Sequence, residues 1–318
     1  MNCLVTGGCG FIGSYLVDKL MKQSHEVTIM DDLSNGEVKN KEIFNRLKIL
    51  DISQLNEKLD YDWVFHLAAK ADVVPSIVNP KKYHETNVVG TLNILEAVRN
   101  SNIKKFVYAA SSSCYGIPEK YPTDENEYCD PQYPYALTKW MGEHLVMHWG
   151  KVYKLPVVSL RLFNVYGVGH KTNGAYGAVM GTFLKQKLEE QPLTIVGDGM
   201  QTRDFTNVND IVDAFILAAE SNITNEIFNV GSGSPHTVLY LASLISDNHI
   251  FISKRPAEPD QTFSNIEKIK TMLGWQPKIQ FVDGVMELLN NIDLYKNSPL
   301  WTKEKIEVET EDWFRYLQ

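Results

Sequence analysis

The first thirteen residues, MNCLVTGGCGFIG, constrain the fold of this chain more than any other stretch. Residues 3–6 form an apolar run short enough for a buried strand, and residues 11–20 have helical periodicity, so the glycines fall in the turn between them. Gly7 permits the tight turn, Gly10 lets backbone N–H groups approach a phosphate, and Gly13 lets the helix pack against the strand. The GxxGxxG spacing alone is weak, but its strand-turn-helix context favours a dinucleotide pyrophosphate site over a merely structural turn.

The composition excludes several other classes of protein. The 318 residues carry 31 basic and 39 acidic side chains, a net charge of −8, without a long basic run, so no nucleic-acid partner is expected. Cys3, Cys9, Cys114 and Cys129 form no CxxC pair, and no charged and apolar leader precedes them. We expect a reduced, cytoplasmic protein with neither disulfides nor a metal site, and no membrane span, because no apolar run approaches roughly twenty residues.

A second predicted strand, residues 26–30, ends in two aspartates, Asp31 and Asp32. A carboxylate at this point accepts hydrogen bonds from the adenosine ribose hydroxyls of NAD and repels the additional phosphate of NADP. The alternative is that one of the pair caps the turn at residues 33–36, and with two aspartates both interpretations can hold. The sequence therefore predicts NAD as the cofactor.

Predicted strands and helices alternate along the first half of the chain. Strands expected at 48–50, 63–67 and 105–110 have helices between them, which predicts an α/β fold with a Rossmann-type doubly wound parallel sheet. The small residues Ala68 and Ala69 leave room for a cofactor. In a helix expected over residues 80–100, Asn87 is an awkward polar residue, and the sequence supports equally an anchor for the cofactor or a loop and a structural hydrogen bond across the sheet.

Polar side chains follow the fifth predicted strand and open the next helix. Ser111, Ser112 and Ser113 leave the carboxyl end of a central strand, which faces the ligand crevice in this fold class. For Ser112 and Ser113 the alternative, a loop that satisfies its own backbone, is stronger than for Ser111. In the following helix, Tyr135 and Lys139 share a face at positions i and i+4.

This trio is suited to acid–base chemistry. A free tyrosine titrates near pH 10, so to act as a base near pH 7 its pKa must fall by about three, or roughly 4 kcal/mol. One ammonium about 4 Å away supplies roughly that free energy at an effective dielectric of about 20. We therefore expect Tyr135 as general base, Lys139 as its electrostatic partner and Ser111 as a donor to the reacting oxygen. The same YxxxK spacing at Tyr15 and Lys19 lacks this context.

The second half of the chain predicts a smaller α/β unit that binds the substrate. A sixth strand is expected over 156–163, and the glycine-rich, polar stretch from 167 to 176 marks the main boundary. Arg203 lies beside a glycine turn, where paired hydrogen bonds suit a diphosphate, with a surface ion pair to Asp204 as the alternative.

The predicted domains are discontinuous in sequence. The cofactor domain comprises residues 1–166 joined by about 207–232, and the substrate domain comprises 167–206 and 233–318, with a helix at 178–190. The tail, residues 301–317, predicts an amphipathic helix that covers the small domain or a subunit interface. Its packing side carries Ile306, Trp313, Phe314 and Leu317.

Six motifs occur in order along the chain: TGGCGFIG, HLAA, SSSCYG, YALTK, RLFNVYG and GDGMQTRDF. In this combination the chain resembles an extended short-chain dehydrogenase/reductase of the NAD-dependent nucleotide-sugar epimerase/dehydratase group, most closely the UDP-glucose 4-epimerases. The resemblance implies a tightly held NAD, a nucleotide-sugar substrate with a UDP-sugar favoured, and a homodimer. It also implies that the base takes a proton from a sugar hydroxyl while a hydride goes to NAD, and that the ketone then turns over and receives the hydride on its other face.

The resemblance assigns residues to three roles. Catalysis falls to Ser111, Tyr135 and Lys139. Substrate binding falls to Ser111, Ser112, Ser113, Asn164, Arg203, Arg255 and Asp260. Cofactor binding falls to Gly7, Gly10, Phe11, Ile12, Gly13, Asp31, Asp32, Asn35, Gly36, Asp51, Ile52, Leu67, Ala68, Ala69, Lys70, Asn87, Tyr135, Lys139 and Phe163.

Departures from the family pattern narrow the reaction. Relatives that dehydrate or decarboxylate carry acidic residues at one or both of the positions held here by Ser112 and Ser113, which favours epimerisation or plain oxidation over elimination. Ala257 stands where many relatives have an arginine. The way in which the diphosphate is bound, and with it the identity of the nucleotide, therefore stays open. Cys114 replaces a common valine and is expected to pack, with a role as an acid as the alternative. Two other functions compete with a 4-epimerase: a nucleotide-sugar dehydrogenase or reductase that releases NADH, and a catalytically silent NAD-binding regulator.

Overall fold

Seven parallel strands form the central sheet of the computed structural model, which describes residues 1–38, 40–170 and 179–317. Their order is β11-β6-β5-β4-β1-β2-β3, which reverses between β1 and β4, and ligands bind at such a switch point in doubly wound sheets. The predicted Rossmann-type sheet is confirmed. The strands are β1 (Asn2–Thr6), β2 (Glu26–Asp31), β3 (Leu47–Ile49), β4 (Trp63–His66), β5 (Lys105–Ser111), β6 (Val157–Leu162) and β11 (Glu226–Val230).

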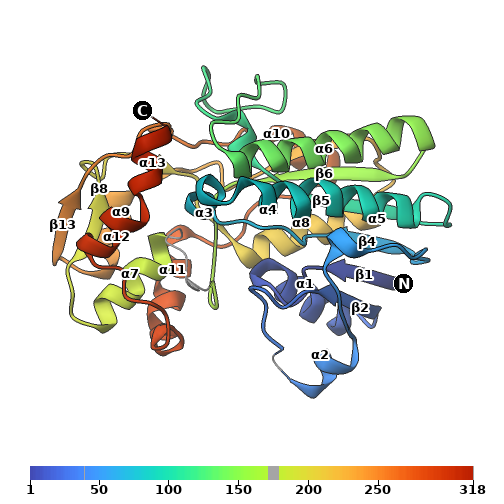
Figure 1. Cartoon of the computed structure of the whole chain (residues 1–318), viewed down its shortest axis with the longest axis horizontal. Helices are drawn as coiled ribbons and strands as arrows, with labels where there is room; N and C mark the ends of the chain where they lie inside the picture. Colours follow the sequence, from blue (N-terminus) through green and yellow to red (C-terminus); the bar gives the residue numbers. More distant parts are fainter. Residues whose placement is uncertain (39, 171–178, 318) are drawn as a thin grey trace.

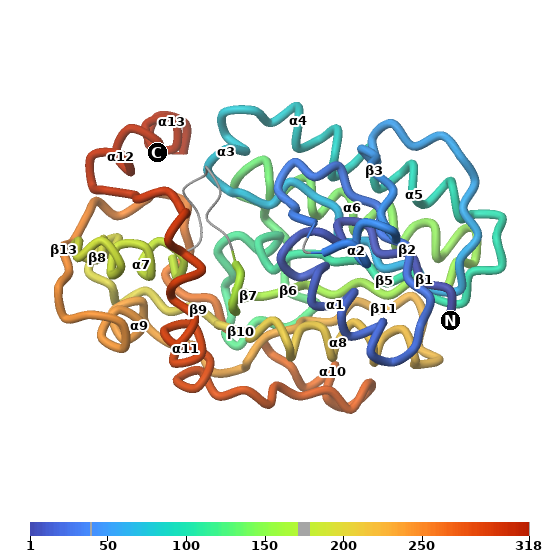
Figure 2. The backbone as a smooth tube through the Cα atoms, turned by 90° about the horizontal axis from the view of Figure 1, so that it is seen from below, coloured from blue at the N-terminus to red at the C-terminus, as the bar shows by residue number. Residues whose placement is uncertain are grey.

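Helices cover both faces of this sheet (Figures 1 and 2). On one face α1 (Phe11–Lys22) packs against α8 (Val208–Glu220), and on the other α5 (Thr91–Val98) packs against α6 (Pro134–Tyr153). The apolar stripe predicted for residues 11–20 is real, because Leu16, Val17 and Leu20 of α1 are completely buried. This burial fixes the start of α1, and with it the glycine turn, at the carboxyl end of β1.

The helix expected over residues 80–100 is not uniform. It consists of α4 (Pro80–His84), a π-helical segment η2 (Glu85–Gly90) and α5. A π-helical turn holds an additional residue and occurs frequently at functional sites. Here it contains Asn87, whose buried side chain bonds to other elements, as described below. Tertiary hydrogen bonds, and not local propensity, account for the departure.

The second unit, on the left in Figure 1, has its own core. Its two-stranded parallel sheet pairs β8 (Leu193–Val196) with β13 (His249–Ile252), and the second of these strands was not predicted. Its core includes Phe183, Leu241 and Val285. The helices of this unit are α7 (Val179–Leu188), α9 (Val238–Ile245) and α11 (Phe281–Asn290), whereas α10 (Glu267–Leu273) packs against β11 of the central sheet. Ala178, the predicted start of α7, and residues 171–176 of the predicted boundary lie outside the described residues.

Several short helices and strands were not predicted. They are α2 (Lys41–Asn45), α3 (Val73–Val78), β7 (Val165–Tyr166) paired with β10 (Thr206–Asn207), and β9 (Thr202–Arg203) paired with β12 (His236–Thr237). Each has six residues or fewer, too short to show a period in the sequence.

The tail forms two helices where one was expected, α12 (Lys303–Glu309) and α13 (Glu311–Tyr316). They meet at Thr310, whose hydroxyl donates to the Ile306 carbonyl at 2.7 Å, the kind of local bond that competes with a regular helix. Ile306 and Trp313 are buried as predicted, whereas Phe314 and Leu317 are half-buried. The tail packs on the second unit and also on α3, beside which α13 lies in Figure 2.

A buried ion pair ties the sheet to α6. Arg161 of β6 and Glu143 of α6 are 4% and 1% exposed, and Arg161 Nη2 lies 2.6 Å from Glu143 Oε1. The Ser159 hydroxyl donates to the second carboxylate oxygen at 2.9 Å, and Arg161 Nη1 donates to the Tyr115 hydroxyl at 2.9 Å. Because both charges are desolvated, the removal of either leaves the other without compensation.

We expect Glu143→Gln, which keeps the side-chain volume, to lower the free energy of unfolding by about 3–5 kcal/mol. The exposed Glu85, 3.7 Å from Lys81, supplies the control, and Glu85→Gln should change stability by less than about 0.5 kcal/mol. Urea denaturation of both variants checks the difference. Equal stability of the two variants would show that the buried pair contributes no more than a surface pair.

Candidate active site

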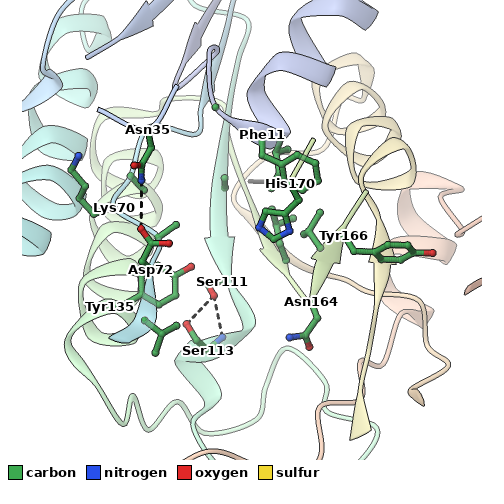
Figure 3. A pocket seen from close by; sticks show the side chains of 18 of the residues that line it. Phe11, Asn35, Lys70, Asp72, Ser111, Ser113, Tyr135, Asn164, Tyr166 and His170 are labelled. Atoms are coloured by element: carbon green, nitrogen blue, oxygen red, sulfur yellow. Dashed lines mark hydrogen bonds between the residues drawn. The ribbon is translucent and has the colours of Figure 1, made fainter. Parts of the chain in front are cut away.

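One cavity of about 1110 Å³ runs across the carboxyl ends of the central strands and into the second unit. It brings together residues from both halves of the chain, and Figure 3 shows Phe11 and His170 facing Ser111 and Tyr135 across it. Every residue predicted for catalysis, cofactor or substrate lines this cavity except Asn87 and Asp260.

The glycine turn has the geometry that a dinucleotide requires. A Cβ on Gly13 would lie 2.1 Å from the Gly7 carbonyl oxygen, and Gly7 itself has φ +71°, so neither position accepts a side chain. Gly10 is the N-cap of α1 and provides no side-chain cap, which leaves the N–H groups of the first helical turn for an anion. The residues present therefore fit a pyrophosphate.

The two aspartates that follow β2 do different things. Asp31 is buried and accepts backbone N–H bonds from Cys9 at 3.0 Å and Leu33 at 2.9 Å, and burial raises the pKa of its carboxyl. Asp32 accepts both the N–H and the hydroxyl of Ser34, at 2.9 and 2.6 Å, and so caps the turn. The turn-capping interpretation is thus confirmed for Asp32, and ribose recognition by Asp31, which lines the cavity, stays a prediction.

A chain of hydrogen bonds behind the cavity joins β1, β4 and the π-helical segment. The Ala68 N–H donates to the Thr6 hydroxyl at 3.2 Å, and this hydroxyl lies 2.7 Å from His66 Nδ1. On the other side of the ring, His66 Nε2 lies 2.9 Å from the Thr91 hydroxyl, which donates to the Asn87 carbonyl at 2.7 Å. Burial lowers the pKa of His66 to about 3, so the ring is neutral.

The Asn87 side chain anchors protein elements. Its Oδ1 accepts from the Lys70 N–H at 2.8 Å, and its Nδ2 donates to the Lys70 carbonyl and to the Thr138 hydroxyl, both at 3.0 Å. With these bonds Asn87 holds the loop after β4 to the start of α6. These bonds support the loop-anchoring interpretation of Asn87, whose side chain does not line the cavity.

Ser111 and Tyr135 meet at the wall of the cavity. The Ser111 hydroxyl lies 2.8 Å from the Ser113 hydroxyl and accepts the Ser113 N–H at 3.2 Å, and both Ser111 and Tyr135 line the cavity. Burial raises the pKa of Tyr135, with Ser111 acting against this shift. The sequence predicted a lowered pKa for Tyr135, and this prediction is wrong. Burial makes a phenolate less favourable than the neutral phenol, which raises the pKa.

Lys139 is buried one turn further along α6. Its Nζ lies 4.3 Å from the centre of the Tyr108 ring, and burial lowers the pKa of the ammonium to about 7, with Glu143 acting against this shift. Lys139 thus titrates near neutral pH, whereas an exposed lysine stays charged there.

At the far end of the cavity, two arginines share one carboxylate. Arg255 Nη1 lies 2.9 Å from Glu258 Oε1, and Arg203 Nη2 lies 3.6 Å from Glu258 Oε2. The alternative that paired Arg203 with Asp204 is wrong, because Asp204 is completely buried and accepts from Ser232, Gly233 and Ser264. The predicted Asp260 is instead exposed and pairs with Lys254 at 2.6 Å.

Several residues of the cavity were not predicted from the sequence as part of the site. His170 stacks on Phe11 with ring centres 4.5 Å apart, and burial lowers its pKa to about 4. Asp72 accepts from the Asn35 amide at 3.5 Å beside the phenol of Tyr135. Tyr133, Glu258 and Trp313 also line the cavity. Only Glu258 carried a usable signal, since an acid three residues after Arg255 suggests a partner for that arginine.

All four cysteines are free thiols, as expected. Cys114 is buried beside Tyr115 and Phe163, with its Sγ 3.7 Å from that of Cys129. Burial raises the pKa of the Cys114 thiol, which supports packing over a role as an acid. Within the described part of the chain, no cluster of side chains suited to a metal ion occurs, and no helix has the length and apolarity needed to cross a membrane.

Comparisons with known proteins agree with this geometry. The sequence profile of the NAD dependent epimerase/dehydratase family matches residues 3–231. A UDP-glucose 4-epimerase of Mycolicibacterium smegmatis is 33% identical over 314 residues, which covers 93% of this chain and 99% of the relative.

Two solved structures share the whole fold. The UDP-N-acetylglucosamine 4-epimerase of Methanobrevibacter ruminantium superposes with a TM-score of 0.85 at 33% identity, over 92% of this chain and 98% of its own. The UDP-glucuronic acid 4-epimerase of Bacillus cereus, solved with UDP-glucuronic acid and NAD, superposes with a TM-score of 0.84 at 32% identity, over 92% of this chain and 99% of its own. The three relatives differ in the sugar that their names carry.

The geometry at Asp31 generates a prediction of cofactor preference. We expect the protein to purify with NAD, and Asp31→Asn to raise the ratio of NADP to NAD affinity at least about tenfold, because the charge that repels the additional phosphate is lost. Asp18→Asn, an exposed change on α1, controls for net charge and should leave the ratio unchanged. Calorimetric titration with both nucleotides measures the ratio, and tighter NADP binding by the unmodified protein would contradict the assignment.

Proposed function

The chain belongs to the NAD dependent epimerase/dehydratase family, and we propose that it interconverts the carbon-4 epimers of a UDP-hexose, or of its N-acetyl or uronic relative, through a 4-keto intermediate. The observation that carries this proposal is that Ser111, Tyr135 and Lys139 line the same cavity, with Lys139 buried one turn after Tyr135 on the same helix. The names of the relatives support the substrate class.

Each member of the trio has a distinct task. Tyr135 takes the proton from the 4-hydroxyl of the sugar and later gives it back, and Ser111 donates to the oxygen as it becomes a ketone. NAD, when bound, takes up the hydride from carbon 4 and supplies it again to the opposite face. Lys139 is buried and Tyr135 is half-buried at the wall of the cavity, which limits the access of water to the reacting oxygen.

The pKa shifts of Tyr135 and Lys139 work together as a pair. Burial alone raises the pKa of Tyr135 and lowers that of Lys139, so each separately disfavours its charged form. A phenolate next to an ammonium reverses both effects, since each ion stabilises the other. The proton of Tyr135 therefore leaves most readily when Lys139 is charged, which links the base to its partner.

The residues of the cavity favour epimerisation over elimination and over a catalytically silent role. Ser112 and Ser113 line the cavity where dehydrating and decarboxylating relatives would carry an acid, so no carboxyl group at these positions can drive elimination. The alternative, a nucleotide-sugar dehydrogenase or reductase that releases NADH, uses the same trio and differs only in the fate of the ketone. A silent NAD-binding regulator would not require the trio.

We also infer the division of labour between the two units and the assembly. Residues 1–166 with 207–232 bind NAD, and 167–206 with 233–318 bind the nucleotide sugar, whose diphosphate Arg203 and Arg255 hold. Exposed Leu137 and Val152 on α6 support a homodimer, and free thiols without disulfides support a cytoplasmic location. Light scattering that gives the mass of one chain would reject the dimer.

We expect Tyr135→Phe to lower turnover by at least about a hundredfold, because the ring still packs but the proton acceptor is gone. The NAD content should stay close to that of the unmodified protein. Tyr128→Phe makes the same chemical change at a side chain that is 79% exposed, and serves as the control. Near-normal turnover of Tyr135→Phe would place the base elsewhere.

The redox balance tests the proposed function itself. An epimerase returns the hydride that it takes, so we expect interconversion of carbon-4 epimers without added cofactor and without growth of NADH absorbance. In deuterated water, the product should carry no deuterium at carbon 4, since the hydride never exchanges with solvent. NMR of reactions with a panel of UDP-, GDP-, CDP- and dTDP-sugars measures both. Stoichiometric NADH with a released keto-sugar would establish the dehydrogenase alternative.

A further inference from the structure

The last helix of the chain, α13, reaches the wall of the cavity through Trp313. This side chain is 1% exposed. Its indole N–H donates to the Pro256 carbonyl at 2.9 Å, and its ring centre lies 5.4 Å from that of Tyr133. Both aromatic rings line the cavity.

Tyr133 stands between the reacting end of the cavity and its arginines. It precedes the catalytic Tyr135 by two residues and is the N-cap of α6. Burial raises the pKa of its phenol, on which the charges of Tyr135, Glu258 and Arg203 also act. Trp313 therefore packs against Tyr133 between the catalytic residues and the arginines, where the hexose of a nucleotide sugar would lie.

The Pro256 carbonyl belongs to the loop that carries the diphosphate arginine. Arg255 precedes Pro256, and Ala257 follows it with φ +57°, a left-handed conformation that is strained for a residue with a side chain. Arg255, Ala257 and Glu258 all line the cavity. The hydrogen bond from Trp313 thus holds a strained loop in place directly beside Arg255.

The same helix, α13, also engages α3 of the cofactor domain. It contacts α3, where Val74 is buried in one cluster with Trp301, Ile306 and Trp313, and with Ile252 of β13. Figures 1 and 2 both place α13 next to α3, across from the sheet that the N-terminus begins. Since Val73 and Val74 line the cavity as well, the tail joins the two units around its substrate end.

We propose that α13 is a clasp that closes the substrate end of the cavity across both units, and that Trp313 is a positioning residue that keeps the keto-sugar in place until the hydride returns. The proposal rests on the proposed function, because an epimerase must retain its ketone until the hydride returns. Trp313 acts through Tyr133 and the Arg255 loop, and takes no part in proton or hydride transfer.

The clasp has a redox consequence. If the ketone leaves before it is reduced, the two electrons taken from carbon 4 stay on the cofactor, so one NADH remains for each keto-sugar released. A loosened clasp therefore turns part of the epimerase flux into enzyme that holds NADH and can no longer start a forward turn. A tail with a merely structural role would lower stability without this leak.

Trp313→Ala and Trp313→Phe in the full-length holoenzyme test the clasp. Phe keeps a ring against Tyr133 but cannot donate to Pro256, whereas Ala removes both contacts. Tyr316→Ala, at an exposed residue of the same helix, is the matched control. Circular dichroism and bound NAD establish that each variant is folded. The readouts are KM and kcat for UDP-glucose, NADH formed per turnover, and the affinities for UDP-glucose and for UDP by calorimetry.

We expect Trp313→Ala to raise KM for UDP-glucose about tenfold or more, with a smaller change in kcat, and to accumulate NADH during turnover. Its affinity for UDP-glucose should fall more than its affinity for UDP, and Trp313→Phe should lie between Ala and the unmodified protein. Unchanged KM and no NADH in the Ala variant would overturn the clasp, as would an equal loss for both nucleotides. If the unmodified protein epimerises no sugar, the proposed function fails, and the two affinities still decide whether Trp313 holds the sugar end.

Discussion

The hydrogen-bond chain through His66 is the interaction on which the geometry of the site depends. The Thr91 hydroxyl donates to the Asn87 carbonyl, so it must accept from His66 Nε2–H. The neutral ring then has only Nδ1 to accept from Thr6, whose oxygen receives the Ala68 N–H. Every donor in this chain has one direction, and a reversed ring would leave a buried group unpaired. The glycine turn and the catalytic helix are thus held in a single register.

That register makes a strongly desolvated catalytic site possible. Asn87 fixes the start of α6 through Thr138, between Tyr135 and Lys139, where Lys139 is buried and Tyr135 faces the cavity. Burial disfavours the charged forms of both groups. In the proposed reaction, the fold supplies the position of the two groups and the partner charge offsets this cost.

What the sequence could predict depends on how local each cause is. Gly7, Gly13 and Asp31 follow from the conformation of one turn and the end of one strand, and the catalytic residues follow from helical spacing after a strand. The break at Thr310 rests on one local hydrogen bond, whereas the π-helical turn around Asn87 could not be predicted because partners on other elements stabilise it. The prediction of a lowered pKa for Tyr135 was wrong for the same reason, because the burial of this side chain depends on its tertiary contacts.

The two ends of the cavity present opposite physical problems. At the cofactor end, neither Gly7 nor Gly13 has room for a side chain, so the backbone is bare there. At the substrate end, Arg203, Arg255 and Glu258 form a charged cluster. A diphosphate that binds the arginines would have to compete with Glu258 for them, so its affinity would be a difference between two sets of ion pairs. In the proposed reaction, this competition favours the release of each sugar product while NAD stays bound.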